Sequence, residues 1–410
     1  MKNAVNAPVV RRCAVPRSLR YNLGIAQPKV TLKNLGVNAR EQVEGESEIR
    51  KDFLYFLLNI MTTTTTRRKP VILVDKPFPQ SHTDYLAERC EIIWYLGNEE
   101  AAAARGKEVE AILWYGHHPL GTAILDTFPN VKVVSNFGAG YEHFDAAAIL
   151  ERNIPMGHTP GCLSETVADF AWGLLICAAR DIVGGIKRCE QMTFTQVNPN
   201  QLGKQVSGCT LGIVGMGSIG SCIAKRARGF NMPVLYHNRN KKSEQQEMEC
   251  NNATFCATLD ELLEKSDYVM LTCPVTTLTN QMMSTDQFIK MKNDAILINM
   301  GRGQLVDHDA LVDALSTGEI GFAALDVTEP EPLPRNHPLV VPREDLKGKI
   351  LISPHQGSAT LGTRFQMLTM SLDNLLAGIE GKRLLWLCKE CIGMKGQTED
   401  VEMGVKYWTK

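Results

Sequence analysis

The 410-residue sequence predicts an α/β protein built on doubly wound parallel sheets, and three observations support this fold class. Short runs of consecutive apolar residues recur along most of the chain, as expected of parallel strands that are covered on both faces. Segments long enough for helices separate these runs, which is the alternation that produces doubly wound sheets. One run leads into a glycine-rich turn, with Gly215, Gly217 and Gly220 at Gly-x-Gly-x-x-Gly spacing. The length allows two such domains.

The expected elements follow one another in a regular order. In the first part of the chain, strands are expected at Val71–Asp75, Ile92–Tyr95, Ala111–Trp114 and Val131–Val134. Later strands are expected at Leu211–Val214, Pro233–His237, Tyr268–Thr272, Ala295–Asn299, Gly321–Asp326 and Ile350–Ser353. Helices are expected at Ser164 to about Asp181, Ser221–Gly229 and about Ala359 to Gly381. The tail after these elements, residues 388–410, has a mixed composition and is expected to be peripheral.

Composition and charge restrict the possible classes of protein. A hydrophobic content of 44% and a charged content of 22% are typical of a soluble globular protein. The formal net charge of −1 gives no reason to expect nucleic acid or an anionic membrane as a partner. No apolar run reaches the roughly 18 residues of a spanning helix. The cysteines are scattered, and the one Cys-x-x-Cys, at Cys388 and Cys391, lacks a second ligand pair. Reduced thiols and no metal are therefore expected.

The N-terminal extension, residues 1–66, differs from the rest of the chain. Residues 1–40 carry several Lys and Arg and no Asp or Glu, which is the charge pattern of an organelle transit peptide. Two other interpretations stay open, a disordered extension and non-native translated sequence upstream of a real start at Met61. Met61 opens a run of threonines before the first strand. A cytoplasmic location is expected, or a mitochondrial one if residues 1–60 are a transit peptide.

The glycine-rich turn predicts a dinucleotide site. Gly215 permits the tight turn, Gly217 lets the backbone approach a pyrophosphate, and Gly220 lets helix and strand pack closely. Ser218 and Ile219 lie at the start of the helix, where free amides can bind phosphate oxygens. A strand, the turn, a helix and a second strand follow in the order that this fold requires, so we expect a nicotinamide dinucleotide.

The residues after the second strand predict which dinucleotide is bound. A site for NAD has an acidic residue there to hold the ribose 2′-hydroxyl. This chain has Asn238 and Arg239, and its first carboxylate is Glu244. An amide and a guanidinium can bind a 2′-phosphate, which a carboxylate would repel. We therefore expect NADPH as cofactor and weaker use of NADH; the alternative is a solvated basic turn.

Three successive strands are each followed by a residue suited to catalysis, namely Arg302, Glu331 and His355. Because ligands bind beyond the carboxyl ends of parallel strands, these residues are expected at one rim. A guanidinium suits a carboxylate or a polarised carbonyl. A carboxylate beside a histidine fixes its tautomer and favours its protonated form, which makes a proton donor near neutral pH.

The chain resembles the D-isomer-specific 2-hydroxyacid dehydrogenases from about Pro70 to Lys382. The motifs that carry the resemblance are the glycine turn, Asn-x-x-Arg-Gly at Asn299–Gly303, Asp-Val…Glu-Pro at Asp326–Pro332 and Pro-His-x-Gly-Ser-Ala-Thr at Pro354–Thr360. The last motif, with Tyr-His-Asn-Arg at Tyr236–Arg239, is similar to the glyoxylate/hydroxypyruvate reductase branch. The resemblance implies that His355 is the acid/base, Glu331 its partner and Arg302 the group that orients the keto acid.

The resemblance also implies contacts with substrate, cofactor and a second subunit. The backbone amides of Ala139 and Gly140 would hold the substrate carboxylate. Thr166 and Asp326 fall where the family contacts the nicotinamide. Cofactor packing is expected at Cys273 and Pro274, where many members have a histidine before the proline. The helix at 164–181 falls where the family forms its homodimer.

The implied architecture is two Rossmann-like doubly wound domains with the active site in the cleft between them. A substrate-binding domain would comprise residues 67–163 and a final helix at 359–387, and a cofactor domain residues 164–358. The expected activity is NADPH-dependent reduction of glyoxylate or hydroxypyruvate, or both. Two alternatives stay open: another 2-oxo acid such as pyruvate, and a dinucleotide-sensing binding protein related to transcriptional corepressors. A pure binding protein would have no need of the three catalytic residues.

Overall fold

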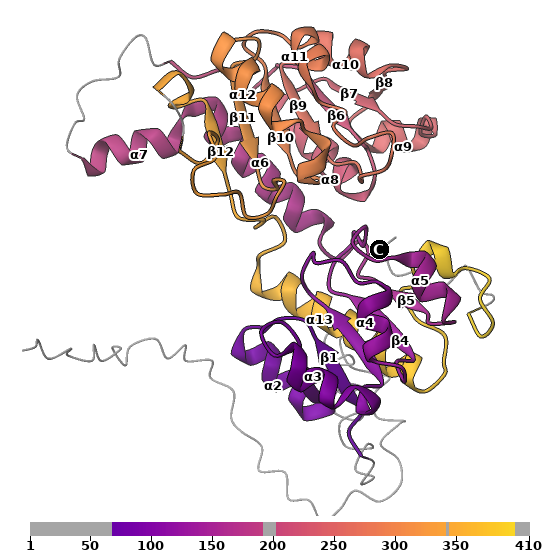
Figure 1. Cartoon of the computed structure of the whole chain (residues 1–410). Helices are drawn as coiled ribbons and strands as arrows, with labels where there is room; N and C mark the ends of the chain where they lie inside the picture. Colours follow the sequence, from indigo (N-terminus) through magenta and orange to yellow (C-terminus); the bar gives the residue numbers. More distant parts are fainter. Residues whose placement is uncertain (1–67, 192–201, 342–343, 398–410) are drawn as a thin grey trace, which may run out of the picture. The chain divides into compact units, whose positions relative to one another are not determined.

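The computed structural model describes residues 68–191, 202–341 and 344–397. The expectations for residues 1–66, including the transit peptide and the start at Met61, lie outside the described residues, as does the end of the tail from residue 398. Figure 1 labels the elements along the chain. None of the described helices is long and apolar enough to cross a membrane.

The first sheet has five parallel strands in the order β2-β1-β3-β4-β5. The strands are β1 (Val71–Val74), β2 (Glu91–Trp94), β3 (Ala111–Trp114), β4 (Val133–Asn136) and β5 (Met156–Gly157). The helices between them are α2 (Gln80–Arg89), α3 (Glu99–Ala104), the 3-10 helix η2 (Gly106–Glu108), α4 (Thr122–Thr127) and α5 (Ala146–Glu151). This order reverses direction between β1 and β3, which makes the carboxyl ends of these two strands a topological switch point.

The second sheet has seven parallel strands in the order β12-β11-β10-β9-β6-β7-β8. The strands are β6 (Leu211–Val214), β7 (Val234–His237), β8 (Thr254–Phe255), β9 (Tyr268–Leu271), β10 (Ile296–Asn299), β11 (Phe322–Leu325) and β12 (Ile350–Ile352). Its order reverses between β6 and β9, so a second switch point follows these strands. This is the strand order of a dinucleotide-binding sheet with one further strand, and the expected fold class is confirmed.

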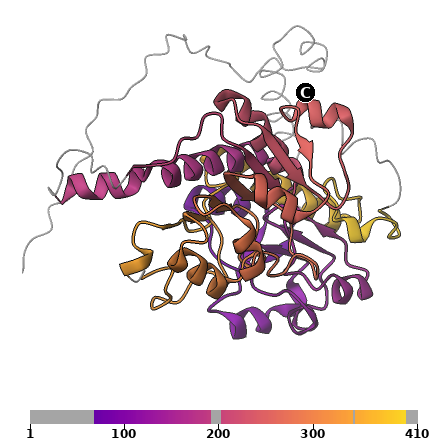
Figure 2. The same ribbon diagram turned by 90° about the horizontal axis from the view of Figure 1, so that it is seen from above.

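The remaining helices cover the sheets or connect them. They are α6 (Ser164–Arg180), α7 (Ile182–Glu190), α8 (Ser218–Ala227), η4 (Arg228–Phe230), α9 (Glu244–Glu249), α10 (Leu259–Lys265), α11 (Thr285–Lys290), η5 (Gly303–Leu305), α12 (His308–Thr317), η6 (Glu344–Leu346), α13 (Leu361–Ile379) and η7 (Lys389–Cys391). The long helix α6 packs on α8 and β10, whereas α13 packs on β3 and β4 of the first sheet. Figure 2 shows α7 extending from the end of α6.

Burial explains why the apolar runs gave a correct prediction of strands. In β1, Val71 and Leu73 enter one core, and Ile72 and Val74 enter the core on the opposite face. Both faces are covered, so every residue of the strand is apolar and none alternates with a polar one. The expected limits of the two domains stay predictions; the two sheets lie at 71–157 and 211–352.

Three expectations about elements were wrong. The strand expected at Val131–Val134 is β4 at Val133–Asn136, because the apolar side chain of Val131 is buried in the preceding loop. The helix after the glycine turn begins at Ser218 and not at Ser221. The tail is not peripheral up to residue 397: Leu387 bridges to β5, and Cys388 and Cys391 are fully buried in the core of the first sheet.

Candidate active site

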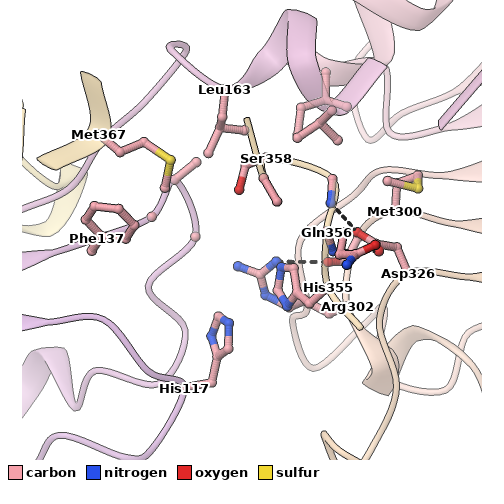
Figure 3. A pocket seen from close by; sticks show the side chains of 18 of the residues that line it. His117, Phe137, Leu163, Met300, Arg302, Asp326, His355, Gln356, Ser358 and Met367 are labelled. Atoms are coloured by element: carbon pink, nitrogen blue, oxygen red, sulfur yellow. Dashed lines mark hydrogen bonds between the residues drawn. The ribbon is translucent and has the colours of Figure 1, made fainter. Parts of the chain in front are cut away.

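One pocket is lined by loops from both sheets and has a volume of about 580 Å³, a size typical of sites for small ligands. Many of the expected site residues line it: Ala139, Gly140, Ser218, Ile219, Cys273, Pro274, Arg302, Asp326, Glu331 and His355. Figure 3 shows Arg302, His355 and Asp326 facing this pocket. The expected residues that do not line it are Gly215, Gly217, Gly220, Asn238, Arg239 and Thr166.

His355 and Glu331 form a direct pair. Nδ1 of His355 lies 2.7 Å from Oε1 of Glu331, and about 30% of each side chain is exposed (29% and 31%). Burial tends to raise the pKa of Glu331, but the hydrogen bond and charge of His355 outweigh it and the pKa is lowered. Since Nδ1 is engaged with the carboxylate, Nε2 is the ring nitrogen left for a ligand.

The loop that carries His355 is held by a buried carboxylate. Asp326 accepts hydrogen bonds from Ser353 Oγ at 2.6 Å and from the backbone N–H groups of Gln356 and Gly357 at 2.8 Å. His355 itself has a φ of 51°, a left-handed backbone conformation that residues other than glycine seldom adopt. Such a conformation costs on the order of 1–3 kcal/mol and is common at functional sites. The strained residue is therefore fixed in place by Asp326.

A second histidine, His117, covers the ring of His355. It belongs to the loop after β3, and the two rings stack with centroids 5.0 Å apart and planes 3° from parallel. Trp114 Nε1 donates to the carbonyl oxygen of His118 and so holds this loop. Burial lowers the pKa of His117 to about 4, and the neighbouring His355 and Arg302 contribute to this shift. His117 is therefore neutral at physiological pH.

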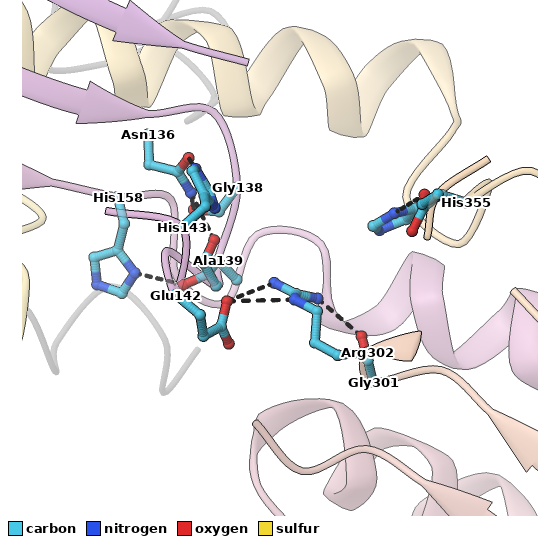
Figure 4. Close-up of polar contacts among 11 residues, drawn as sticks. Asn136, Gly138, Ala139, Glu142, His143, His158, Gly301, Arg302 and His355 are labelled. Atoms are coloured by element: carbon cyan, nitrogen blue, oxygen red, sulfur yellow. Dashed lines mark hydrogen bonds and ion pairs between the residues drawn. The ribbon is translucent and has the colours of Figure 1, made fainter. Parts of the chain in front are cut away.

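Arg302 reaches the loop after β4. Its Nη2 and Nε donate to Oε2 of Glu142 at 3.1 Å and 3.3 Å, and its Nη1 donates to the carbonyl oxygen of Gly301 at 2.9 Å. A side chain at position 140 would collide with the guanidinium, so Gly140 is what allows the two to lie together. Figure 4 shows Arg302 between Glu142 and Gly301, and His355 apart from this cluster.

The loop from Gly138 to Gly140 is held by its carbonyl oxygens. Asn136 Nδ2 donates to those of Gly138 and Gly140 at 3.0 Å and 2.8 Å, and His158 Nδ1 lies 2.8 Å from that of Ala139. The second atom of the Asn136 amide, Oδ1, lies 3.1 Å from Nε2 of His143. Among the described residues, no acceptor takes the N–H of Ala139 or Gly140. These two amides can therefore bind an anionic ligand.

The glycine turn fits a bound pyrophosphate. Gly215 has a φ of 97°, and a side chain there would collide with the backbone of Cys273. A Cβ at position 220 would lie 2.6 Å from the carbonyl oxygen of Gly215, whereas the space beside Gly217 is open. The first amides of α8 have no partner inside the helix and follow directly on this open space.

Comparisons with known proteins agree with this geometry. Residues 172–357 match the model of the D-isomer specific 2-hydroxyacid dehydrogenase NAD binding domain. Glyoxylate/hydroxypyruvate reductase B of Escherichia coli is 39% identical over 320 residues, which are 77% of this chain and 96% of that protein. The chain belongs to the D-isomer-specific 2-hydroxyacid dehydrogenase family.

Solved structures support the same assignment. An NADPH-dependent glyoxylate/hydroxypyruvate reductase from Sinorhizobium meliloti, solved with NADP and malonate, is 30% identical with a TM-score of 0.70, covering 78% of this chain and 97% of that one. A Thermus thermophilus protein is 36% identical with a TM-score of 0.69, covering 77% and 99%. The resemblance to the glyoxylate/hydroxypyruvate reductase branch is confirmed, and the chain is an NAD(P)-dependent oxidoreductase.

In this dehydrogenase the residues expected to select the cofactor lie at the end of β7. Asn238 Oδ1 accepts from the N–H of Met216 at 2.7 Å, which ties this side chain to the glycine turn. Arg239 is exposed and forms no ion pair with a described carboxylate. Lys241 is bound to Glu247 at 3.8 Å. The guanidinium of Arg239 is therefore available to an anionic ligand.

Two expected cofactor contacts have partners inside the protein. The hydroxyl of Thr166 lies 2.7 Å from that of Thr363, which links α6 to α13, and Thr166 does not line the pocket. Cys273 contacts the sulfur of Met282 at 3.8 Å, and burial raises the pKa of its thiol to about 11. Cys273 is therefore a neutral packing residue.

Sequence reasoning missed several pocket residues of this dehydrogenase. His117 and Glu142 are the partners of His355 and Arg302 from the other sheet, and Asn136 organises the loop between them. Lys76 and Arg364 also line the pocket. Glu142 could have been found from its position directly after the Phe-Gly-Ala-Gly-Tyr segment, whereas His117 has no pattern of its own. In the described residues, no group of His, Cys, Asp and Glu could hold a metal ion.

Proposed function

We propose that this protein is an NADPH-preferring reductase of glyoxylate, hydroxypyruvate or both, which become glycolate and D-glycerate. The observation that carries the proposal is the 2.7 Å pair of His355 and Glu331 in a pocket that also contains Arg302. Reduction of small 2-oxo acids is also what the names of the similar reductases support. A dinucleotide-sensing binding protein would need only the glycine turn and no acid/base pair.

Each residue of the site has a distinct role in this reaction. The amides of Ala139 and Gly140 bind the substrate carboxylate, and Arg302 orients the keto group and stabilises the negative charge that develops on its oxygen. His355 donates a proton from Nε2 to that oxygen. Glu331 holds Nδ1 and stabilises the protonated ring. Glu142 keeps Arg302 in place against the substrate loop.

The residues present fit the dinucleotide. Its pyrophosphate would lie over Gly217 at the start of α8, its nicotinamide near Asp326, Cys273 and Pro274, and its 2′-phosphate against Asn238 and Arg239. When bound, it supplies the hydride that reduces the keto carbon. The guanidinium of Arg239, which is exposed and forms no ion pair with a described carboxylate, is the feature that favours NADPH over NADH.

The assembly proposed is a homodimer through α6 and the helix that follows it. Most of α6 is already buried by its own chain, but α7 has no buried residue. Ile182 and Ile186 lie four residues apart on α7 and are 39% and 54% exposed, so the two apolar side chains share one exposed face of this helix. Light scattering should give a dimer for the wild type and a monomer for Ile186→Asp; a monomeric wild type would contradict this assembly.

Initial rates of NADPH and NADH oxidation with a panel of 2-oxo acids test the function. Glyoxylate and hydroxypyruvate should be reduced with the highest kcat/KM among glyoxylate, hydroxypyruvate, pyruvate and a branched 2-oxo acid, and faster with NADPH than with NADH. Preference for pyruvate or the branched acid would move the protein to another substrate within the family. No oxidation with any acid, together with tight dinucleotide binding, would favour the binding protein.

A further inference from the structure

Two cations in the pocket form no ion pair with a carboxylate of the described residues. Lys76 and Arg364 line the pocket and are half-buried, and neither forms an ion pair within the described part of the chain. The carboxylates of the pocket, Glu142, Asp326 and Glu331, are each already bonded to other groups of the site. Positive charge in a partly desolvated pocket is costly unless an anion offsets it. These two cations are therefore suited to an anion that the described residues do not provide.

The two cations lie around one aromatic side chain. Lys76 Nζ is 4.5 Å from the centroid of the Tyr115 ring, and Arg364 Cζ is 5.9 Å from it. Arg364 is also 5.8 Å from the ring of Phe137, the residue directly before the loop proposed to bind the substrate carboxylate. Cation–π contacts of this kind hold a cation while leaving its N–H groups free for another partner. Both side chains are thus held beside the proposed substrate loop.

The position of these residues in the sheet also favours ligand binding. Lys76 follows β1 and Tyr115 follows β3, so both stand at the switch point of the first sheet, where sheets of this class bind ligands. The neighbouring carboxylate, Asp75, accepts the backbone N–H groups of Tyr115 and Gly116 at 2.7 Å and 2.6 Å. Asp75 therefore fixes the loop, and although its charge acts on Lys76, the two side chains form no ion pair in the described residues.

The position of Arg364 adds to the same electrostatic argument. Arg364 is in the first turn of α13, which has no acidic residue. The positive end of the helix dipole and the guanidinium repel each other there, so an anion stabilises both. His117 lies near Lys76 and Arg302, and because burial lowers its pKa to about 4, it contributes no negative or positive charge at neutral pH.

We propose that Lys76 and Arg364 form a second anion subsite, which binds a carboxylate or phosphate at the end of the substrate remote from its 2-oxo acid group. The substrates favoured by this subsite are 2-oxo acids that carry two anionic groups (called dianionic acids below), such as oxaloacetate, 2-oxoglutarate or 3-phosphohydroxypyruvate. The inference rests on the proposed function, in which Arg302 and the amides of Ala139 and Gly140 bind the first carboxylate.

Steady-state kinetics on four variants test the subsite. The quantity measured is the ratio of kcat/KM for each dianionic acid to kcat/KM for hydroxypyruvate, in the wild type and in Lys76→Gln, Arg364→Gln, Lys76→Arg and Lys107→Gln. Each Gln substitution at the subsite should lower the ratio for at least one dianionic acid about tenfold or more, the effect of losing one charge-assisted hydrogen bond. Lys76→Arg keeps the positive charge, so its kcat/KM ratios should stay close to those of the wild type. Lys107 is exposed on η2 and serves as the matched control.

Comparison of the three dianionic acids also shows whether the subsite binds a carboxylate or a phosphate. If the kcat/KM ratio falls only for 3-phosphohydroxypyruvate, the subsite binds phosphate. If the ratio falls for oxaloacetate and 2-oxoglutarate, the subsite binds a carboxylate. A parallel fall for hydroxypyruvate would mean that the cations bind the carboxylate common to all 2-oxo acids, and would overturn the proposal. So would a weaker affinity for NADPH in the Gln variants, because it would place a cofactor phosphate at these cations.

A binding measurement keeps the subsite testable if the proposed function fails. Calorimetric titration of the NADPH complex with succinate and with propionate compares a dianion and a monoanion of similar size without turnover. The wild type should bind succinate more tightly, and Lys76→Gln and Arg364→Gln should lose that difference. Equal affinities in the wild type would overturn the subsite, whereas absence of turnover with every 2-oxo acid would refute only the proposed reaction.

Discussion

Replacing Glu331 by Gln should move the high-pH limb of the pH–rate profile for reduction to lower pH. Glu331 Oε1 is 2.7 Å from Nδ1 of His355, and this contact holds the pKa of the carboxyl below its usual value against the opposing effect of burial. The carboxylate is therefore charged at neutral pH and favours the protonated ring. Because reduction requires a protonated donor, activity is expected at low pH and should decline as pH rises.

The size of the shift follows from the geometry. A charge-assisted hydrogen bond contributes about 1.5–3 kcal/mol. Both side chains are about 70% covered, so solvent screens the pair only in part (exposed fractions 29% and 31%). At about 1.36 kcal/mol per pH unit, the limb should move down by roughly 1 to 2 pH units.

The assay is the initial rate of NADPH oxidation with saturating glyoxylate across the neutral pH range. Glu142→Gln is the matched control, since it removes a carboxylate of the same pocket that is bonded to Arg302 and not to His355. Glu142→Gln should raise KM for glyoxylate and leave the high-pH limb of the pH–rate profile unchanged. A Glu331→Gln enzyme with a reduced rate and an unmoved limb would show that the carboxylate does not govern the protonation of the proton donor.

Three further predictions concern cofactor choice, the second histidine and the N-terminal segment. Arg239→Ala should weaken the preference for NADPH over NADH by roughly 1.5–3 kcal/mol, measured as the ratio of the two kcat/KM values; equal efficiency with both cofactors in the wild type would refute the assignment. His117→Ala should lower kcat by roughly 2- to 10-fold through loss of the ring stack on His355, and His117→Phe should restore most of it; equal rates in both variants would exclude this role. A chain that begins at Met61 should fold and turn over like the full chain; an insoluble or inactive product would show that residues 1–60 belong to the fold.

The sequence predicted most strands because their burial leaves a direct trace in composition. Every residue of β6 and β9 is buried, so each appears as an unbroken apolar run. β5 and β8 have only two residues each, too few for any pattern to show. The tail was misjudged because Cys388 and Cys391 are separated by charged residues, and their burial is visible only once β5 is in place.

The candidate site was predictable where function places a residue directly after a strand. Arg302, Glu331 and His355 follow β10, β11 and β12, and neighbouring parallel strands bring their ends together. The residues that support them were not predictable in the same way. His117 and Glu142 come from loops of the other sheet, so their contacts with His355 and Arg302 depend on how the two sheets face one shared pocket. No local spacing in the sequence records such a contact.

The most direct test of the proposed mechanism is single-turnover reduction by His355→Gln. Dinucleotide affinity should stay close to that of the wild type, because the glycine turn at Gly215–Gly220 and the guanidinium of Arg239 lie outside the contacts of His355. The rate of hydride transfer to glyoxylate should fall by about 100- to 10,000-fold, the range for losing a general acid. A rate within a few-fold of the wild type would show that the proton comes from another group, and would contradict the assignment of His355 as the donor.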